Sequence, residues 1–375
     1  MAFTGGRTVS DRLSGNDVEL RGVSMRFGDF TAVEETNLTV EAGEFFSILG
    51  PSGCGKTTIL RMVSGFLQPT TGQVVIGGTD MTALGPNRRP TALIFQNLAL
   101  FPLMTVWENV AFGLEARGVG KAERRRRADE LLDLVALTGQ GDKRPTELSG
   151  GQRQRVAVAR ALAVEPSVLL LDEPLSALDL KLRQHMRAEL KTIQRKTAIT
   201  FIYITHDQGE ALTMSDRIAV MNRGRIEQVA RTEEIYDRPA TPFVATFVGE
   251  QNVFRGRVAG VADGFAQVET SSGRFTGLNA GSLKEGEEAM MFVRPERMGL
   301  ANGSGAPANR LSAQIERRDL EGPFVNVFLR GHGDEEIVMH LTNAGEAWRS
   351  LAGEQQIGFQ ADDALVMRSG ELARD

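Results

Sequence analysis

A glycine-rich run between a strand-like and a helix-like segment constrains this chain more than any other feature. Residues 50–57 read GPSGCGKT and fit the phosphate-binding pattern G-x-x-x-x-G-K-[ST] at every fixed position. Residues 44–49 before it form an apolar run of strand length, and residues 56–67 are typical of a helix. A strand, a turn and a helix are the context in which this pattern binds nucleotides. The sequence therefore predicts a nucleotide site rather than a glycine-rich turn with an incidental lysine.

Each residue type in this loop has a chemical reason. Glycines let backbone N–H groups turn toward phosphate oxygens, and the following helix N-terminus adds partial positive charge. Lys56 is expected to reach the β- and γ-phosphates, and the Thr57 hydroxyl to ligate Mg²⁺. We therefore expect nucleotide contacts from Gly50, Pro51, Ser52, Gly53, Cys54, Gly55, Lys56, Thr57 and Thr58.

Cys54 is the one cysteine of the chain, which excludes an internal disulfide and fits a reducing compartment. It stands between Gly53 and Gly55, where N–H groups, Lys56 and a helix N-terminus all favour a thiolate. We expect a reactive thiol close to the nucleotide.

The bulk composition limits the class of protein. With 375 residues, 41% of them hydrophobic, the chain has the length of about two domains, and no apolar run approaches the 18 residues that a membrane helix needs. Residues 1–17 lack the apolar core of a signal peptide and are expected to form a disordered tail. The net charge of −5 argues against a nucleic-acid partner.

Polar residues follow three further strand candidates, residues 91–95, 168–171 and 200–205. In open parallel sheets, ligands gather at the carboxyl ends of strands. Asp172 is expected to hold Mg²⁺, and Glu173 to orient or deprotonate an attacking water. Gln96 is placed to see the γ-phosphate or its metal, and His206 to support the reaction.

A second glycine pair stands before the helix expected over residues 153–164. Ser149 is placed to cap that helix, and Gly150 and Gly151 allow close approach of an anion. We interpret Ser149, Gly150, Gly151 and Gln152 as a second phosphate-binding helix end, because an ordinary capped helix does not require two glycines. Phe27, before Gly28, either stacks on an adenine ring or belongs to the core.

With these parts together, residues 18–240 resemble the ATPase subunit of an ABC transporter. The resemblance implies a P-loop α/β cassette with a helical subdomain, which binds ATP and Mg²⁺ and forms a homodimer. In that family the signature sequence of one subunit closes on ATP held by the Walker A loop of the other. The correspondences are Phe27 with the adenine-stacking aromatic, residues 50–57 with Walker A, Gln96 with the Q-loop, residues 148–152 with the signature, Asp172 and Glu173 with Walker B and the catalytic glutamate, residues 176–179 with the D-loop, and His206 with the switch histidine.

The remainder, residues 241–375, has short alternating runs between glycine-rich turns, which predict a small all-β, OB-like domain. Residues 299–309 are expected to break this domain into two halves, 252–298 and 310–368. Residues 233–254 and 293–296 resemble the junction and β-domain of importer ATPases for polyamines, ferric iron, phosphonates, sulfate and sugars.

The resemblance implies the ATP-hydrolysing subunit of an importer, peripheral to the cytoplasmic face of the inner membrane. A permease would dock near Gln96–Met104, and a solute-binding protein would act indirectly. Residues 100–106 resemble the polyamine and ferric-iron branch, although Leu98 and Leu103 stand where relatives often have Tyr and His. The alternatives are an importer for sulfate, phosphonate or sugar, and a soluble non-transport ABC ATPase. The latter would need two cassettes or a long coiled-coil insertion, and neither is visible here.

Overall fold

The computed structural model describes residues 13–301, 307–332, 335–344 and 347–373. Two compact units divide between Thr232 and Glu233. Most of the tail expected over residues 1–17 lies outside the described residues. The rest of it is held in place, because Leu13 is buried and the Gly15 amide donates to the Ala198 carbonyl at 2.9 Å.

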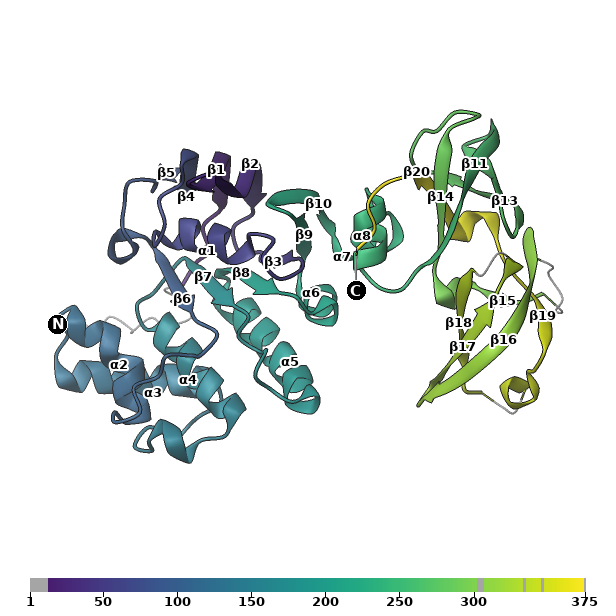
Figure 1. The fold of residues 1–375 in the computed structure, drawn as a ribbon. Coiled ribbons are helices and arrows are strands. Elements are labelled where there is room, and N and C mark those ends of the chain that lie inside the picture. The colour runs from purple at the N-terminus through teal and green to yellow at the C-terminus, as the bar shows by residue number, and fades with distance from the viewer. Residues whose placement is uncertain (1–12, 302–306, 333–334, 345–346, 374–375) are drawn as a thin grey trace. The chain divides into compact units, whose positions relative to one another are not determined.

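A six-stranded sheet forms the centre of the first unit (Figure 1). All of its neighbouring strands are parallel except the antiparallel edge pair β9 and β10. All five residues of β3 are buried, as expected for a strand covered on both faces. In spatial order the strands are β10 (Arg225–Arg231), β9 (Arg217–Asn222), β3 (Phe45–Leu49), β8 (Thr200–Thr205), β7 (Val168–Asp172) and β6 (Thr91–Ile94).

Successive residues of these strands point to opposite faces, and each face has its own core. Phe46 and Leu170 pack in one cluster with α1 and the antiparallel sheet, whereas Phe45 and Leu171 pack in another with α2, α3, α4 and α5. Figure 1 shows the same division of the helices. The helices are α1 (Lys56–Ser64), α2 (Val106–Ala116), α3 (Lys121–Leu134), α4 (Gly150–Leu162), α5 (Leu180–Thr197) and α6 (Gln208–Met214).

A second, antiparallel sheet of four strands completes the first unit. Its strands are β2 (Phe30–Val40), β1 (Val18–Phe27), β4 (Thr71–Ile76) and β5 (Thr79–Asp80), in spatial order. Strands β1 and β2 pair as a long hairpin, whose open end joins residues 18–20 to residues 38–40. The turn of this hairpin contains Gly28, with φ 59°, directly after Phe27.

The second unit contains two short helices, a closed barrel and a five-stranded sheet. The helices are α7 (Thr232–Asp237), which starts one residue before this unit, and α8 (Pro242–Phe247). The barrel consists of β11 (Asn252–Ala262), β12 (Phe265–Thr270), β13 (Gly273–Asn279), β20 (Ala364–Arg368) and β14 (Glu288–Val293). The sheet consists of β15 (Gly299–Leu300), β19 (Glu354–Phe359), β16 (Asn309–Glu321), β17 (Phe324–Arg330) and β18 (Glu336–Thr342).

The two expected halves of this unit are not separate along the chain. Strand β20, from the second half, closes the barrel of the first by pairing with β13 and β14. The two sheets also share one core, in which the rings of Phe254, Phe275 and Phe359 lie 5.3 to 5.9 Å apart. The expected fold class, an α/β cassette followed by a small β-domain, is confirmed.

Candidate functional site

The glycine-rich loop joins β3 to α1, as predicted. Gly53 and Gly55 have φ angles of 78° and 109°, which other residues rarely adopt. A side chain at Gly55 would also meet the Ala32 carbonyl oxygen at 2.6 Å. Gly55 is the N-cap of α1 and offers no side-chain oxygen to its first amides, so these donors can face an anion. Lys56 Nζ donates to the carbonyls of Gly50 and Pro51 at 2.7 and 2.9 Å, which holds the cation at the loop.

Thr57 and Asp172 meet across the space between α1 and β7. The Thr57 hydroxyl donates to Asp172 Oδ1 at 3.2 Å, and burial raises the pKa of the Asp172 carboxyl. In the described part of the chain, no three His, Cys, Asp or Glu side chains form a metal-ligand cluster. A hydroxyl and a carboxylate supply the hard oxygen ligands that fit Mg²⁺, which takes its other ligands from phosphate and water.

Glu173 has an unusual backbone conformation at the end of β7. Its φ angle is 44°, and its amide donates to the Ile204 carbonyl of the neighbouring strand at 3.1 Å. In this conformation Glu173 Oε2 lies 3.2 Å from Nδ1 of His206, the residue that follows β8. The side chain of His206 is 54% exposed and that of Glu173 is 23% exposed, so both can reach a substrate.

Gln96, which follows β6, reaches the same region through Ser176. Gln96 Nε2 donates to Ser176 Oγ at 3.1 Å, and that hydroxyl donates to the Glu173 carbonyl at 2.9 Å. Three strand ends are thereby linked at one edge of the sheet, together with the turn that precedes α5. Gln96 was also expected to ligate the metal. In this arrangement its side chain bonds to Ser176 and not to Thr57 or Asp172, the two other expected metal ligands.

The Cys54 prediction is wrong. The residue is 3% exposed, and it belongs to the apolar cluster that contains α1. Burial raises the pKa of the thiol above its ordinary value, although Lys56 Nζ lies 3.9 Å from the sulfur and opposes this effect. The side chain therefore packs behind the loop, and only the backbone of Cys54 remains a candidate for nucleotide contacts.

Phe27 lies at the end of β1 and is 48% exposed, so it is not a core residue. Its partner across the hairpin, Phe30, is 64% exposed. Two accessible aromatic rings at one turn leave the stacking role open to Phe27. Ser52 lies in the loop and Thr58 lies in the first turn of α1, and their nucleotide contacts stay a prediction.

The second glycine pair opens α4. Ser149 is the N-cap, and its hydroxyl and the Gln152 side chain form a reciprocal capping box. The glycines also have a packing reason that the sequence interpretation missed. A side chain at Gly151 would lie 2.9 Å from Leu182, and one at Gly150 would lie 3.1 Å from Leu178. A capped helix that packs against Leu182 of α5 and against Leu178 of the preceding turn therefore accounts for both glycines. The anion role of this turn depends on a partner subunit.

One arginine that no motif indicated shapes the loop after Gln96. Arg160, in the last turns of α4, donates to the carbonyls of Leu98 and Ala99 at 2.6 Å each. Both residues have positive φ angles, and burial lowers the pKa of the Arg160 guanidinium. Asn109 adds hydrogen bonds to the amide and carbonyl of Phe101. The resulting rigid loop presents Leu103, which is 84% exposed.

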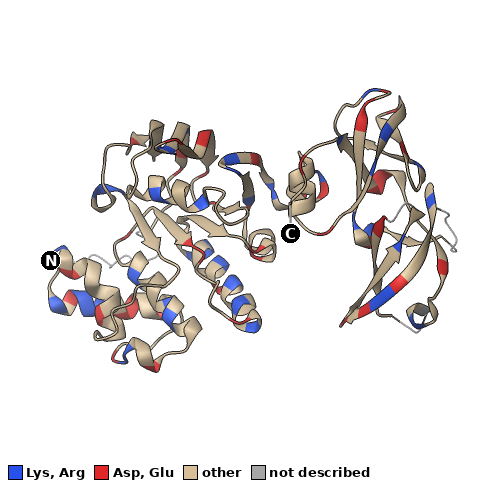
Figure 2. Ribbon diagram, viewed as in Figure 1, with Lys and Arg blue, Asp and Glu red and all other residues tan. Residues whose placement is uncertain are grey.

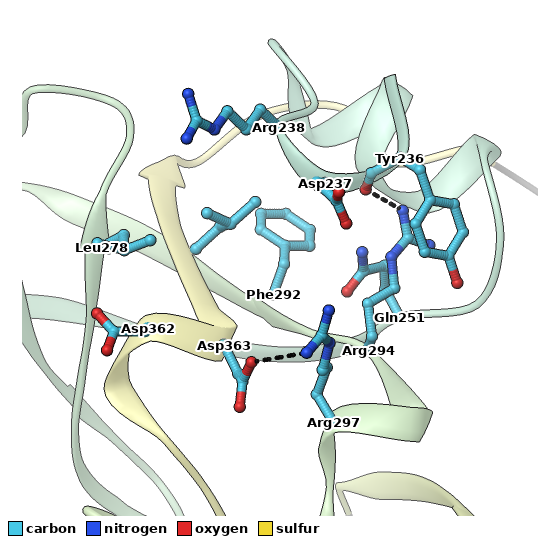
Figure 3. A pocket seen from close by; sticks show the side chains of 11 residues that line it. Tyr236, Asp237, Arg238, Gln251, Leu278, Phe292, Arg294, Arg297, Asp362 and Asp363 are labelled. Carbon is cyan, nitrogen blue, oxygen red and sulfur yellow. Dashed lines mark hydrogen bonds and ion pairs between the residues drawn. The ribbon is translucent and has the colours of Figure 1, made fainter. Parts of the chain in front are cut away.

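The second unit contains a cavity of about 250 Å³ near α7 (Figure 3). Arg294 lies beside it with its guanidinium carbon 3.8 Å from the centre of the Tyr236 ring. The Arg294 side chain donates to the carbonyls of Tyr236 and Val248, and the Tyr236 hydroxyl donates to Glu296 at 2.6 Å. Burial and this hydrogen bond raise the pKa of Tyr236 to about 12. The expected junction motif at 293–296 thus clamps α7 to the barrel strand β14.

Comparison with known protein families assigns two regions. A family described as ABC transporter matches residues 33–176, and a family described as TOBE domain matches residues 291–367. None of the helices within the described ranges is both long and apolar enough to cross a bilayer.

Three similar proteins are spermidine/putrescine import ATP-binding proteins named PotA. The protein of Acidothermus cellulolyticus is 54% identical and covers 91% of this chain and 93% of its own. That of Rubrobacter xylanophilus is 48% identical over 93% of both chains, and that of Roseobacter denitrificans is 46% identical over 90% and 93%. A solved dimeric structure of the ATP-binding cassette MJ0796 with ADP and Pi is 34% identical, with a TM-score of 0.51, over 57% of this chain and 98% of that cassette.

Proposed function

The chain belongs to the ABC transporter family as an ATP-binding, ATP-hydrolysing subunit, and from that premise we propose that it energises the import of polyamines such as spermidine and putrescine. Similarity to import proteins for these solutes over nine-tenths of the chain supports the substrate class. Residues 100–106, which resemble the polyamine and ferric-iron branch, agree with it.

The meeting of Glu173 and His206 at one sheet edge is the observation that best supports the catalytic assignment. We assign Glu173 as the group that orients and deprotonates the attacking water, since its carboxylate is accessible and lies beside a second proton-carrying side chain. His206 would steady the water and the γ-phosphate. Gln96, through Ser176, would report the presence of that phosphate to the loop that follows β6.

The nucleotide assignment covers the loop of residues 50–57 with Thr58, and Phe27 for the adenine ring. Thr57 and Asp172 would hold Mg²⁺, which neutralises charge on the phosphate oxygens when bound. Gln96 stays a candidate third ligand. Lys56, now hydrogen-bonded to two loop carbonyls, would exchange these for phosphate oxygens.

We infer a homodimer in which Ser149, Gly150, Gly151 and Gln152 of one copy approach the nucleotide of the other. Helices α1 and α4 pack on opposite faces of the central sheet, so the two glycine-rich turns belong to different layers of one chain. The dimeric state of the solved cassette relative supports a dimer. Closure would exclude water and strengthen every charge interaction at the phosphate.

The permease would dock on residues 96–104, at the cytoplasmic face of the inner membrane, with a solute-binding protein acting from the other side. The exposed Leu103 and the partly exposed Phe101 and Phe112 support an apolar contact there. The test is uptake by proteoliposomes that contain the chain, ATP and the permease that is encoded beside the gene for this chain. Labelled spermidine or putrescine should accumulate, whereas accumulation of sulfate or a sugar instead would contradict the proposed substrate.

A further inference from the structure

Arg183 of α5 contacts two loops of the site at once. Helix α5 starts directly after the turn of residues 176–179, and Arg183 Nη2 donates back to the Leu178 carbonyl at 3.1 Å. Its other terminal nitrogen, Nη1, donates to Asp207 Oδ2 at 2.9 Å. Asp207 is the residue directly after His206. One planar guanidinium therefore joins the turn that follows Glu173 to the turn that contains His206.

The residues on both sides of His206 are fixed by side-chain hydrogen bonds. Asp207 caps α6, since its Oδ1 accepts from the Glu210 amide at 2.9 Å, and it also accepts from Arg187 at 3.2 Å. On the other side, Thr205 Oγ1 accepts from the Asp207 amide at 2.9 Å and donates to Glu210 Oε2 at 2.7 Å. The exposed imidazole thus stands on a backbone with little freedom to move.

Arg183 is the cation that lies near both acidic side chains of this cluster, Asp207 and Glu210. Glu210 is 3% exposed, and its Oε2 also accepts from the Tyr203 hydroxyl at 2.6 Å. Its other oxygen lies 3.8 Å from Arg183 Nε, a buried nitrogen that has no hydrogen-bond partner among the residues that the structure describes. Arg183 thus faces two carboxylates, Asp207 and Glu210, where solvent screens charges weakly. Figure 2 marks further Lys and Arg positions along the ribbon of α5, which supply a matched control.

We propose that Arg183 is a positioning residue for ATP hydrolysis, which sets the spacing between the Glu173 turn and His206 by holding Leu178 and Asp207 on one guanidinium. This inference rests on the proposed roles of Glu173 and His206. The requirement is geometric, because a lysine can pair with Asp207 but cannot present two donors in a fixed plane. Displacement of a reacting group by about 1 Å can lower turnover on the order of 10²-fold.

The test compares Arg183→Lys and Arg183→Gln with Arg187→Gln. Within the described residues Arg187 also donates to Asp207, but Leu178 accepts from Arg183 and not from Arg187. Arg195→Gln, at an exposed position on the same helix, is the surface control. Both Arg183 variants should lower kcat about 10- to 100-fold and leave the KM for ATP within about 3-fold, because the phosphate loop is untouched. Arg187→Gln should lose clearly less, and Arg195→Gln should match the unmodified chain.

Thermal unfolding of each variant separates positioning from folding. Arg183→Lys should keep the melting temperature of the parent within a few degrees and still lose turnover. Normal turnover of Arg183→Lys would overturn the inference, and so would equal losses in the Arg183 and Arg187 variants or parallel losses of turnover and ATP affinity. An unmodified chain without ATP hydrolysis would instead contradict the proposed function.

Discussion

His206 Nδ1 lies 3.2 Å from Glu173 Oε2, although the two residues follow different strands of the central sheet. The parallel pairing of β7 with β8 brings both strand ends to the same edge. The positive φ angle of Glu173 and the bonds around His206 then decide which way each side chain points. A proton acceptor and a proton carrier at this distance can act on one water molecule.

Replacement of Glu173 by Gln should therefore stop turnover without loss of ATP binding. The amide keeps the shape of the side chain but not the basic oxygen, and such a group contributes about 10²- to 10⁴-fold. Steady-state hydrolysis and binding of a fluorescent ATP analogue measure the two effects, with the exposed Glu35→Gln as control. Hydrolysis within about tenfold of the parent would exclude the general-base role.

Much of the site could be predicted because its chemistry is local in sequence. The loop of residues 50–57 and the carboxylates at the end of β7 are defined by short motifs at strand ends, and parallel pairing brings these ends together. Side-chain direction is different. Cys54 was expected to face the nucleotide, but its direction depends on packing against residues distant in sequence, such as Met221.

Nonlocal pairing was the other limit. The closure of the barrel by β20 depends on partners in β13 and β14, more than 70 positions earlier in the chain, and a five-residue strand has no periodicity that indicates a partner. The purpose of Gly151, anion binding or helix packing, could not be decided from the sequence for a similar reason. Only the position of Leu182 reveals that this glycine is needed for close packing of two helices.

Loss of the Arg294 side chain should destabilise the second unit more than loss of an ordinary surface arginine. The side chain is 7% exposed and donates to the main-chain carbonyls of Val248 and Tyr236. Arg294→Ala should lower the free energy of unfolding of the second unit by about 2–4 kcal/mol. Arg297→Ala is the control, since its ion pair with Asp363 is half exposed and should cost less than about 1 kcal/mol. Equal losses in urea titrations would contradict the clamp.

The nucleotide-binding domain, expected over residues 18–240, should fold without the β-domain. The core clusters around α1 and around α2 to α5 draw on residues no later than Val229, whereas the clusters of the second unit begin at Ala245. We propose a truncation after Arg231, because Tyr236 in α7 bonds to Arg294. The fragment should unfold cooperatively and bind ATP. An insoluble fragment, or one that ignores ATP, would show that the units depend on each other.

The thiol of Cys54 should resist alkylation. The thiol is 3% exposed and burial raises its pKa. A maleimide can therefore react only when the loop opens locally. At pH 8 the labelling rate should be at least about 10²-fold lower in the native chain than in denaturant. Cys54→Ser is the control for labelling at other sites. Rapid native labelling that MgATP prevents would restore the view that this side chain faces the nucleotide.

Glu44, just before β3, should destabilise the folded chain as pH rises. It is 7% exposed, and burial raises the pKa of its carboxyl despite the Glu41 amide and the nearby Arg217. The Glu44 carboxyl thus holds its proton more tightly in the folded state than in the unfolded state, in which it titrates at about pH 4.3. Its favourable contribution is complete below that pH and is lost as pH rises through the folded pKa.

Substitution of Glu44 by Gln removes this titration and keeps an oxygen that can accept from the Glu41 amide. Glu44→Gln should therefore be more stable than the parent at pH 8, and the difference between their free energies of unfolding should shrink toward pH 4. Urea titrations at several pH values measure this, with the exposed Glu35→Gln as the control. A difference independent of pH, or a Glu44→Gln variant less stable at pH 8, would mean that the pairing with Arg217 outweighs the cost of burying the carboxylate.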